Sequence, residues 1–231
     1  MSSESAFNKR LTSESTMDKV EGLLEHFNLP PKVIDFIRRH QKLIRIIIAV
    51  IVIIVVSWSL YSSHIEKVRE EAASALSLAR QADSASQAEA FKKVYQEYGN
   101  TSSALWAKVE LAHMAMKDGS FADASTQYTA ILGEVEEASP LYPLILFSLA
   151  QALEGEKKYQ DASGRYDLLK GMKGFEYLAY SGLGRLEEAQ GNVDKAIAVY
   201  NNFLLTVADD PALAQAKMDI EAKVSRLKAR Q

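Results

Sequence analysis

The stretch LGRLEEAQGNVDKAIAVYNNF, residues 183–203, decides the fold of this 231-residue chain. A small residue, Gly184, stands near its start, and another, Ala196, stands twelve positions later. Tyr200 stands four residues after Ala196, and Phe203 stands three residues after Tyr200. Spacings of three and four residues place side chains on one face of a helix. The stretch therefore predicts a helix that carries Gly184 and a second helix that carries Ala196, Tyr200 and Phe203.

The same order of residue types occurs twice upstream. The equivalent residues are Ala112, Ala124, Tyr128 and Ile131 in one stretch and Ala150, Ala162, Tyr166 and Leu169 in the other. From Ala150 to Gly184 is 34 residues, whereas from Ala112 to Ala150 is 38, which indicates a four-residue insertion near Pro140. Small residues let two antiparallel helices approach closely, and the larger ones fill the space against the neighbouring pair. Because each pair buries only part of its apolar face, several pairs must stack.

The segments beside these stretches extend the stack. Gly119 and Gly191 mark turns between paired helices, and Gly182 next to Gly184 indicates helix packing rather than a nucleotide loop. Upstream, a second helix of a more divergent pair is predicted from Ala88, Phe91, Val94, Tyr95 and Tyr98, with its first helix within residues 66–82. Downstream, Pro211 starts a predicted capping helix with one apolar face, formed by Leu213, Ala216, Ile220, Val224 and Leu227.

Residues 104–208 resemble the tetratricopeptide repeat, a helix–turn–helix of 34 residues with small residues at the crossing points. They depart from its consensus by lacking the first Trp, in whose place stand Lys108, Leu146 and Tyr180. The resemblance implies an all-α chain. We expect a single transmembrane helix followed by a tetratricopeptide-like α-solenoid of about three to four degenerate helical hairpins plus a C-terminal capping helix.

The transmembrane helix is predicted from an uncharged run of 18 residues, Ile46 to Ser63, whose centre up to Val56 is wholly apolar. At about 1.5 Å per residue it spans about 27 Å, close to the thickness of a hydrocarbon core. Arg45 can extend its charge to the headgroups at one end, and Trp58 and Tyr61 suit the aromatic belt at the other. A buried core helix is the alternative, but such a helix normally carries polar residues over this length.

Five basic residues and one acid precede the run within 32–45, whereas the segment after it is mixed in charge. The positive-inside rule then predicts three parts: a cytoplasmic segment 1–42 with an amphipathic helix, a signal anchor 43–63 and a repeat domain 64–231 on the far side of the membrane. A cleaved signal peptide is the competing interpretation. It would need a very long basic region, and Ser57-Trp58-Ser59 is a poor cleavage site.

The cytoplasmic segment is expected to hold two short helices. Val20, Leu23, Leu24 and Phe27 recur at helical spacing, Leu29-Pro30-Pro31 ends that helix, and a second starts around Val33. The first helix needs a surface, which is either the bilayer or a cytosolic protein.

Composition and motifs argue against nucleic-acid binding, metal binding and enzymatic activity. Residues 1–63 carry a net charge of +2 and residues 64–231 of −5, so no broad basic face for nucleic acid is expected. There is no Cys, and the four histidines stand apart without a His-Glu-x-x-His motif, which excludes thiolate chemistry and predicts no metal site. No phosphate-binding loop or Gly-x-Ser-x-Gly motif occurs. We expect no catalytic residues, no cofactor and no enzymatic activity.

The resemblance implies a peptide-binding groove on the first helix of each pair. Counted from Ala112, Ala150 and Gly184, its inward positions are Trp106, Val109, His113, Met116, Leu144, Phe147, Gln151, Glu154, Leu178, Ser181, Arg185 and Glu188. This mixture suits an extended or partly unfolded peptide. Equally, four of them can pack against the upstream repeat or the chain itself, namely Trp106, Val109, Leu144 and Phe147. Apolar groove residues can also support self-association.

The whole layout is similar to the YfgM-like family, ancillary subunits of the bacterial SecYEG translocon. The features that carry this similarity are the basic tail, one anchor, an Ala-rich helix at residues 70–76 and the degenerate repeats. The resemblance implies a single-pass protein of the bacterial inner membrane whose repeat domain, residues 64–231, lies in the periplasm. It also implies partners among translocon subunits, periplasmic chaperones or exported clients. An assembly or regulatory factor for another envelope complex, with the cytoplasmic helix as a second binding site, is the alternative.

Overall fold

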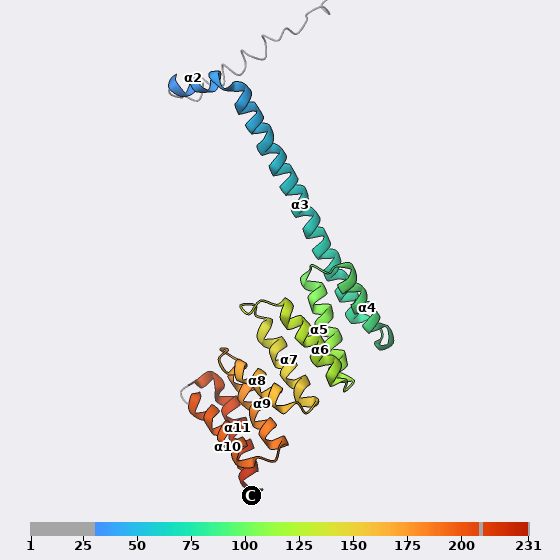
Figure 1. Ribbon diagram of the computed structural model, residues 1–231, viewed down its shortest axis with the longest axis vertical. Helices are drawn as coiled ribbons and strands as arrows, with labels where there is room; N and C mark the ends of the chain where they lie inside the picture. The colour runs from blue at the N-terminus through green and yellow to red at the C-terminus, as the bar shows by residue number, and fades with distance from the viewer. Residues whose placement is uncertain (1–30, 208–209, 231) are drawn as a thin grey trace, which may run out of the picture. The chain divides into compact units, whose positions relative to one another are not determined.

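The computed structural model describes residues 31–207 and 210–230, and over those residues the chain is built from helices without strands (Figure 1). It divides into two compact units, residues 1–65 and residues 66–231. The predicted helix around Val20 and Phe27 lies outside the described residues.

The first unit contains α2 (Pro31–Arg39) and the beginning of α3 (Gln41–Gln81). Pro31 occupies the first helical position, where a missing N–H costs nothing. The second predicted N-terminal helix is therefore present, and it ends two residues before α3 begins.

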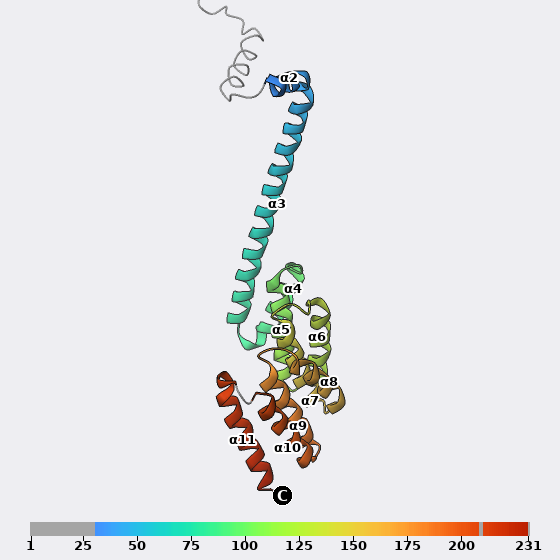
Figure 2. The ribbon, with the colours of Figure 1, turned by 90° about the vertical axis from the view of Figure 1, so that its left-hand side faces the viewer.

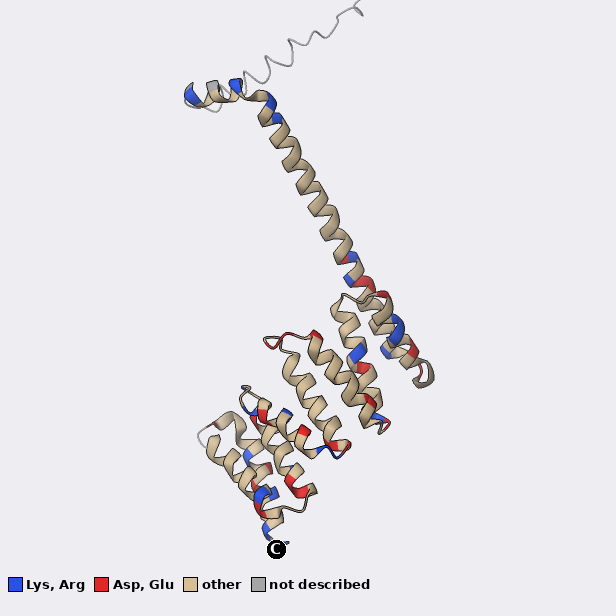
Figure 3. Ribbon diagram, in the orientation of Figure 1, with Lys and Arg blue, Asp and Glu red and all other residues tan. Residues whose placement is uncertain are grey.

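Helix α3 carries an 18-residue window with a mean hydropathy of 2.8, none of which is buried. Figure 3 shows this part of α3 without Lys, Arg, Asp or Glu. Trp58 is 72% exposed and Tyr61 63% exposed, while Arg45 Nε donates to the Gln41 carbonyl at 3.3 Å. By length and composition, this is the one helix among the described residues that is able to cross a membrane.

The second unit is a solenoid of helical hairpins, as predicted (Figure 2). Its elements after the end of α3 are α4 (Ser84–Glu97), α5 (Ser102–Lys117), α6 (Phe121–Glu134), α7 (Tyr142–Gly155), α8 (Tyr159–Lys170), α9 (Glu176–Ala189), α10 (Val193–Thr206), the 3-10 helix η1 (Pro211–Leu213) and α11 (Ala214–Lys228). The predicted divergent first pair is formed by the end of α3 with α4, since Leu76 and Ala79 share a core cluster with Phe91 and Val94.

The predicted crossing points form the core of the solenoid. Ala112, Ala150, Ala162 and Ala196 are fully buried, and so are the rings of Tyr128, Tyr166 and Tyr200. A Cβ at Gly184 would collide with the Tyr200 ring, and a Cβ at Gly182 with the Tyr166 ring. Tyr166 and Tyr200 thus each lie against a glycine, and the two glycines are the helix-packing site that the sequence indicated.

The capping helix α11 also follows its prediction. Its Ile220, Val224 and Leu227 are buried in one cluster with Tyr200 and Phe203 of α10. Asp210 caps η1, because its carboxylate accepts from the Ala212 N–H at 2.8 Å. The last hairpin is therefore covered on its far side, as a terminal repeat requires.

The turn inside each of the three hairpins α5–α6, α7–α8 and α9–α10 uses one left-handed residue. This residue is Gly119, Lys157 or Gly191, with φ of 75°, 61° and 77°. In each turn the next N–H donates to the carbonyl five residues earlier at 2.9 Å; the pairs are Ser120–Ala115, Lys158–Leu153 and Asn192–Glu187. This is the Schellman arrangement, in which glycine is preferred because a Cβ costs about 1 kcal/mol there. Lys157 is the member that the sequence did not mark.

Replacing Lys157 by Gly is expected to raise the free energy of unfolding by about 0.5–1 kcal/mol, because glycine has no Cβ to clash in the left-handed backbone conformation. The measurement is urea unfolding of the full-length protein in mild detergent, followed by circular dichroism. Lys195→Gly is the matched control, since Lys195 is an exposed residue inside α10. There glycine is expected to lower the free energy of unfolding by about 1 kcal/mol. A loss of stability in Lys157→Gly would contradict the strain at this turn.

Candidate protein-binding site

The predicted groove residues lie on α5, α7 and α9, the first helices of three hairpins, and the structure divides eight of the twelve into two groups. The first group is open. Trp106 on α5 is 38% exposed and Leu144, its equivalent on α7, is 46% exposed. His113 is exposed, with its ring 5.8 Å from that of Tyr128, and the Phe147 ring lies edge-on to Tyr166 at 6.1 Å. Aromatic and aliphatic surface is thus accessible along neighbouring helices.

Four further predicted residues are less accessible. Val109 is 1% exposed and belongs to the core, because it turns toward the cluster that contains Tyr128. Met116 is partly buried against the same cluster, and Gln151 and Leu178 are also partly buried. The alternative that some of these residues pack against the chain therefore holds for Val109 and in part for Phe147, which is partly buried against the same cluster.

The second group is occupied by hydrogen bonds between the hairpins. Arg185 on α9 donates from Nε and Nη2 to the two oxygens of Glu154 on α7, at 3.1 and 2.9 Å. The Tyr166 hydroxyl on α8 donates to Glu154 at 2.8 Å and accepts from Arg185 at 3.0 Å. Burial, with the nearby charge of Glu154, raises the pKa of Tyr166 well above its usual range. This network joins three helices and leaves Glu154 and Arg185 satisfied.

Helix α11 occupies the remaining predicted residues. Arg226 donates to Glu188 at 2.9 Å, and Glu188 also accepts from the Tyr200 hydroxyl at 2.6 Å. Lys223 donates to the buried Ser181 at 2.8 Å. Ser181 and Glu188 therefore bind the capping helix, and the open part of the groove is restricted to α5 and α7.

Sequence reasoning missed the residues that hold α11 in place. Besides Lys223, Asp219 accepts from the Tyr177 hydroxyl at 2.6 Å, and its pKa is lowered by the hydrogen bonds from Tyr177 and Lys223. These partners stand 42 residues apart. The only sequence signal is that the polar face of α11 carries Asp219, Lys223 and Arg226 at four- and three-residue spacing, which also fits a solvated surface.

The tyrosine at the first crossing point lacks the partner that the other two have. Tyr166 and Tyr200 each donate to a glutamate twelve residues earlier, whereas Met116 stands at that position relative to Tyr128. The buried Tyr128 hydroxyl makes no hydrogen bond of acceptable geometry. Ser148 lies beside it, but its own proton goes to the Leu144 carbonyl at 3.0 Å. Burial raises the pKa of Tyr128 to about 12.

Within the described residues, no group of three or more His, Cys, Asp or Glu side chains is placed to hold a metal ion. The ionisable side chains at the groove are instead paired with one another, as Glu154 is with Arg185 and Glu188 with Arg226. The arrangement offers apolar surface and hydrogen bonds for recognition.

Stacked helical hairpins with a partly open groove define this chain as a helical-repeat protein of the kind that typically serves as a non-catalytic protein-interaction scaffold. The chain belongs to the tetratricopeptide repeat-like domain family, whose match runs over residues 35–223. No curated protein sequence matches it significantly.

Two solved structures are similar to this chain. A putative kinesin light chain from Podosopora anserina with nearly identical TPR-like repeats is 17% identical; the match covers 69% of this chain and 85% of that one, with a TM-score of 0.53. A tetratricopeptide repeat protein from Parabacteroides merdae is 18% identical over 71% of this chain and 77% of that one, with a TM-score of 0.31. At these identities the kinesin light chain likeness speaks for the fold alone.

Phenylalanine substitutions compare the hydrogen-bonded hydroxyl of Tyr166 with the Tyr128 hydroxyl, which has no partner. Tyr166→Phe is expected to lower the free energy of unfolding by about 1.5–3 kcal/mol, because it removes hydrogen bonds to charged groups. Tyr128→Phe, which removes the same atom from an equivalent buried position without a partner, is expected to leave stability unchanged or raise it. Urea unfolding of both variants in detergent measures the difference. Equal losses would show that the Tyr128 hydroxyl has a partner after all.

Proposed function

We propose that this protein is a membrane-tethered scaffold of the bacterial cell envelope that binds other proteins through the open groove on α5 and α7. The observation that carries the proposal is the accessible apolar surface of Trp106 and Leu144 on neighbouring first helices, beside the rings of His113 and Phe147. Aromatic and aliphatic anchors of this kind dominate protein recognition. A bound peptide is restricted to these two helices, because the second group of predicted residues is already hydrogen-bonded within the chain. The protein acts by binding, without catalysis or cofactor.

The tether is the apolar part of α3. An exposed window of 18 residues without charge is stable in a bilayer and costly in water. The basic residues before it favour a cytoplasmic N-terminus, and residues 64–231 then lie in the periplasm. A tether raises the local concentration of a weak binder near its clients, so modest affinity in the groove is sufficient.

The partners that we propose are subunits of the Sec translocon, periplasmic chaperones or the exported chains that pass between them. Two considerations support this proposal: the similarity of the whole layout to the YfgM-like family, and the open apolar surface, which suits extended segments before they fold. The family match to tetratricopeptide repeat-like domains supports protein binding in general.

In-cell photocrosslinking tests this function. A photoreactive amino acid at Leu144 is expected to give discrete crosslinks to translocon subunits, chaperones or exported proteins, identified by mass spectrometry. The control position is Leu168, which is 51% exposed but lies on the second helix α8. Crosslinks of equal yield and identity at both positions would contradict a specific groove, and a complete lack of envelope partners at Leu144 would contradict the proposed function.

Protease accessibility tests the tether. The residues after the anchor should be protected in intact cells and degraded in spheroplasts, whose outer membrane is opened. The protein should also stay with the membrane fraction at high salt. Release of the intact chain into the soluble fraction would contradict the proposed membrane tether.

A further inference from the structure

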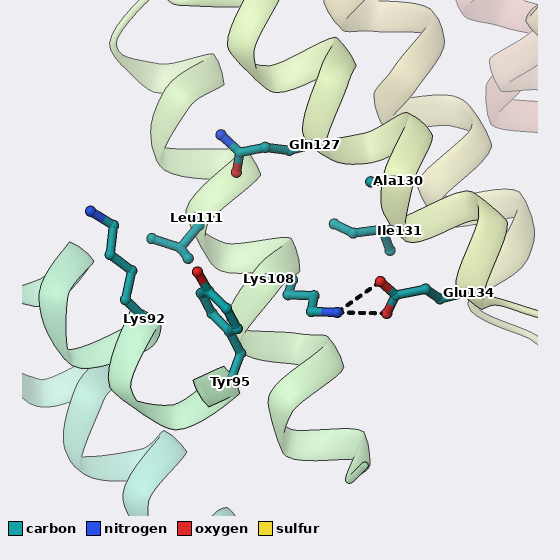
Figure 4. A pocket seen from close by; sticks show the side chains of 8 residues that line it. All are labelled: Lys92, Tyr95, Lys108, Leu111, Gln127, Ala130, Ile131 and Glu134. Carbon is teal, nitrogen blue, oxygen red and sulfur yellow. Dashed lines mark hydrogen bonds and ion pairs between the residues drawn. The ribbon is translucent and has the colours of Figure 1, made fainter. Parts of the chain in front are cut away.

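The second unit contains a hollow of about 420 Å³ between α4, α5 and α6 (Figure 4). Its apolar lining includes Tyr95 from α4, Leu111 from α5 and Ile131 from α6. Lys92 of α4 stands at its edge, and on the far wall Lys108 of α5 donates to both oxygens of Glu134 at 2.8 and 2.7 Å. A cavity of this size takes a large side chain together with part of its backbone.

The hollow is separate from the groove. Successive residues of a helix are rotated by about 100°. Lys108 and Leu111 therefore face roughly opposite to Trp106 and His113 on α5. The hollow opens between the second helices α4 and α6, whereas the groove residues lie on the first helices.

In the third hairpin the chain fills the equivalent place itself. Lys108, Ile131 and Glu134 correspond to Tyr180, Phe203 and Thr206, each 72 residues further on. The Tyr180 ring lies 5.8 Å from the Phe203 ring, and its hydroxyl is 3.4 Å from the Thr206 hydroxyl. The ammonium of Lys170, at the end of the preceding second helix α8, lies 5.8 Å from the centre of the Tyr180 ring. An aromatic ring under a lysine is thus the occupant that this fold accepts there.

The second hairpin fills the place with Leu146, which is fully buried. In the first of the three, the residue is Lys108, and its long side chain reaches across to Glu134 instead of packing into the space (Figure 4). Lys108 and Glu134 are 26 residues apart, as Tyr180 and Thr206 are, so the ion pair stands where the third hairpin has a contact between two hydroxyls. The hollow lies beside this ion pair.

We propose that the hollow between α4, α5 and α6 receives an aromatic side chain, tyrosine or phenylalanine, from a partner protein. The ring takes the place that Tyr180 takes in the third hairpin and lies against Ile131 and Leu111. Lys92 at the edge supplies the cation that Lys170 supplies to Tyr180, and a tyrosine hydroxyl reaches the Lys108–Glu134 pair. This second docking site lies beyond the groove and does not depend on it.

Methyl NMR of the full-length protein in nanodiscs tests the site with a defined probe, the peptide acetyl-Gly-Ser-Tyr-Ser-Gly-amide. Saturable shifts are expected for the methyl groups of Ile131 and Leu111, with Met116 on the groove side as the internal reference. The peptide with alanine in place of tyrosine should bind at least about tenfold more weakly. Shifts confined to Met116, or equal binding of the alanine peptide, would overturn the proposal.

Filling the hollow from within gives the decisive comparison. Lys108→Tyr should weaken the peptide at least about tenfold, because it restores the occupant found in the third hairpin. The control Lys195→Tyr places the same residue on exposed α10 and should bind as the unmodified chain does. Ala130→Trp blocks the hollow from α6 without touching the ion pair and should act as Lys108→Tyr does. Undiminished binding in both blocked variants, or Ile131 shifts that follow the nanodisc lipid alone, would refute an aromatic protein partner.

Discussion

The close approach of paired helices at small residues is the constraint on which the rest of the structure depends. Tyr166 and Tyr200 could not be buried where they lie if the helix opposite carried larger side chains. Gly184 makes room for Tyr200 and Gly182 makes room for Tyr166. Once these two tyrosines are buried, their hydroxyls reach glutamates on the first helices α9 and α7.

The tyrosines therefore connect the core to the binding surface. At Tyr166 and Tyr200 the hydroxyl meets a glutamate, and an arginine from the next element completes the network. In each network several hydrogen bonds hold the ion pair in place, and partial burial strengthens them. The downstream part of the groove is therefore occupied by hydrogen bonds within the chain. Its upstream part, around Trp106 and Leu144, stays accessible.

How much of this the sequence predicts depends on whether the deciding contact is local. The hairpins follow from spacings of three, four and twelve residues, which the chain displays directly. The turn at Lys157 was not marked, because a left-handed lysine leaves no trace in composition. Ser181 and Glu188 were predicted to line the groove, but their partners lie on α11, 42 and 38 residues away, and no local pattern pairs them. Lys108 was visible only as a departure from the repeat consensus, and the hollow that it leaves required the positions of three helices.

The most direct test of the central constraint compares two glycines inside helices. A Cβ at Gly184 meets the Tyr200 ring, whereas a Cβ at Gly164 in α8 meets nothing within 4 Å. In urea unfolding of the full-length protein, Gly184→Ala is expected to lose about 2–3 kcal/mol through overpacking. Gly164→Ala is expected to gain up to about 1 kcal/mol from helix propensity. If both alanine variants were equally stable, the tyrosines would not depend on close helix approach, and the account of the fold would fail.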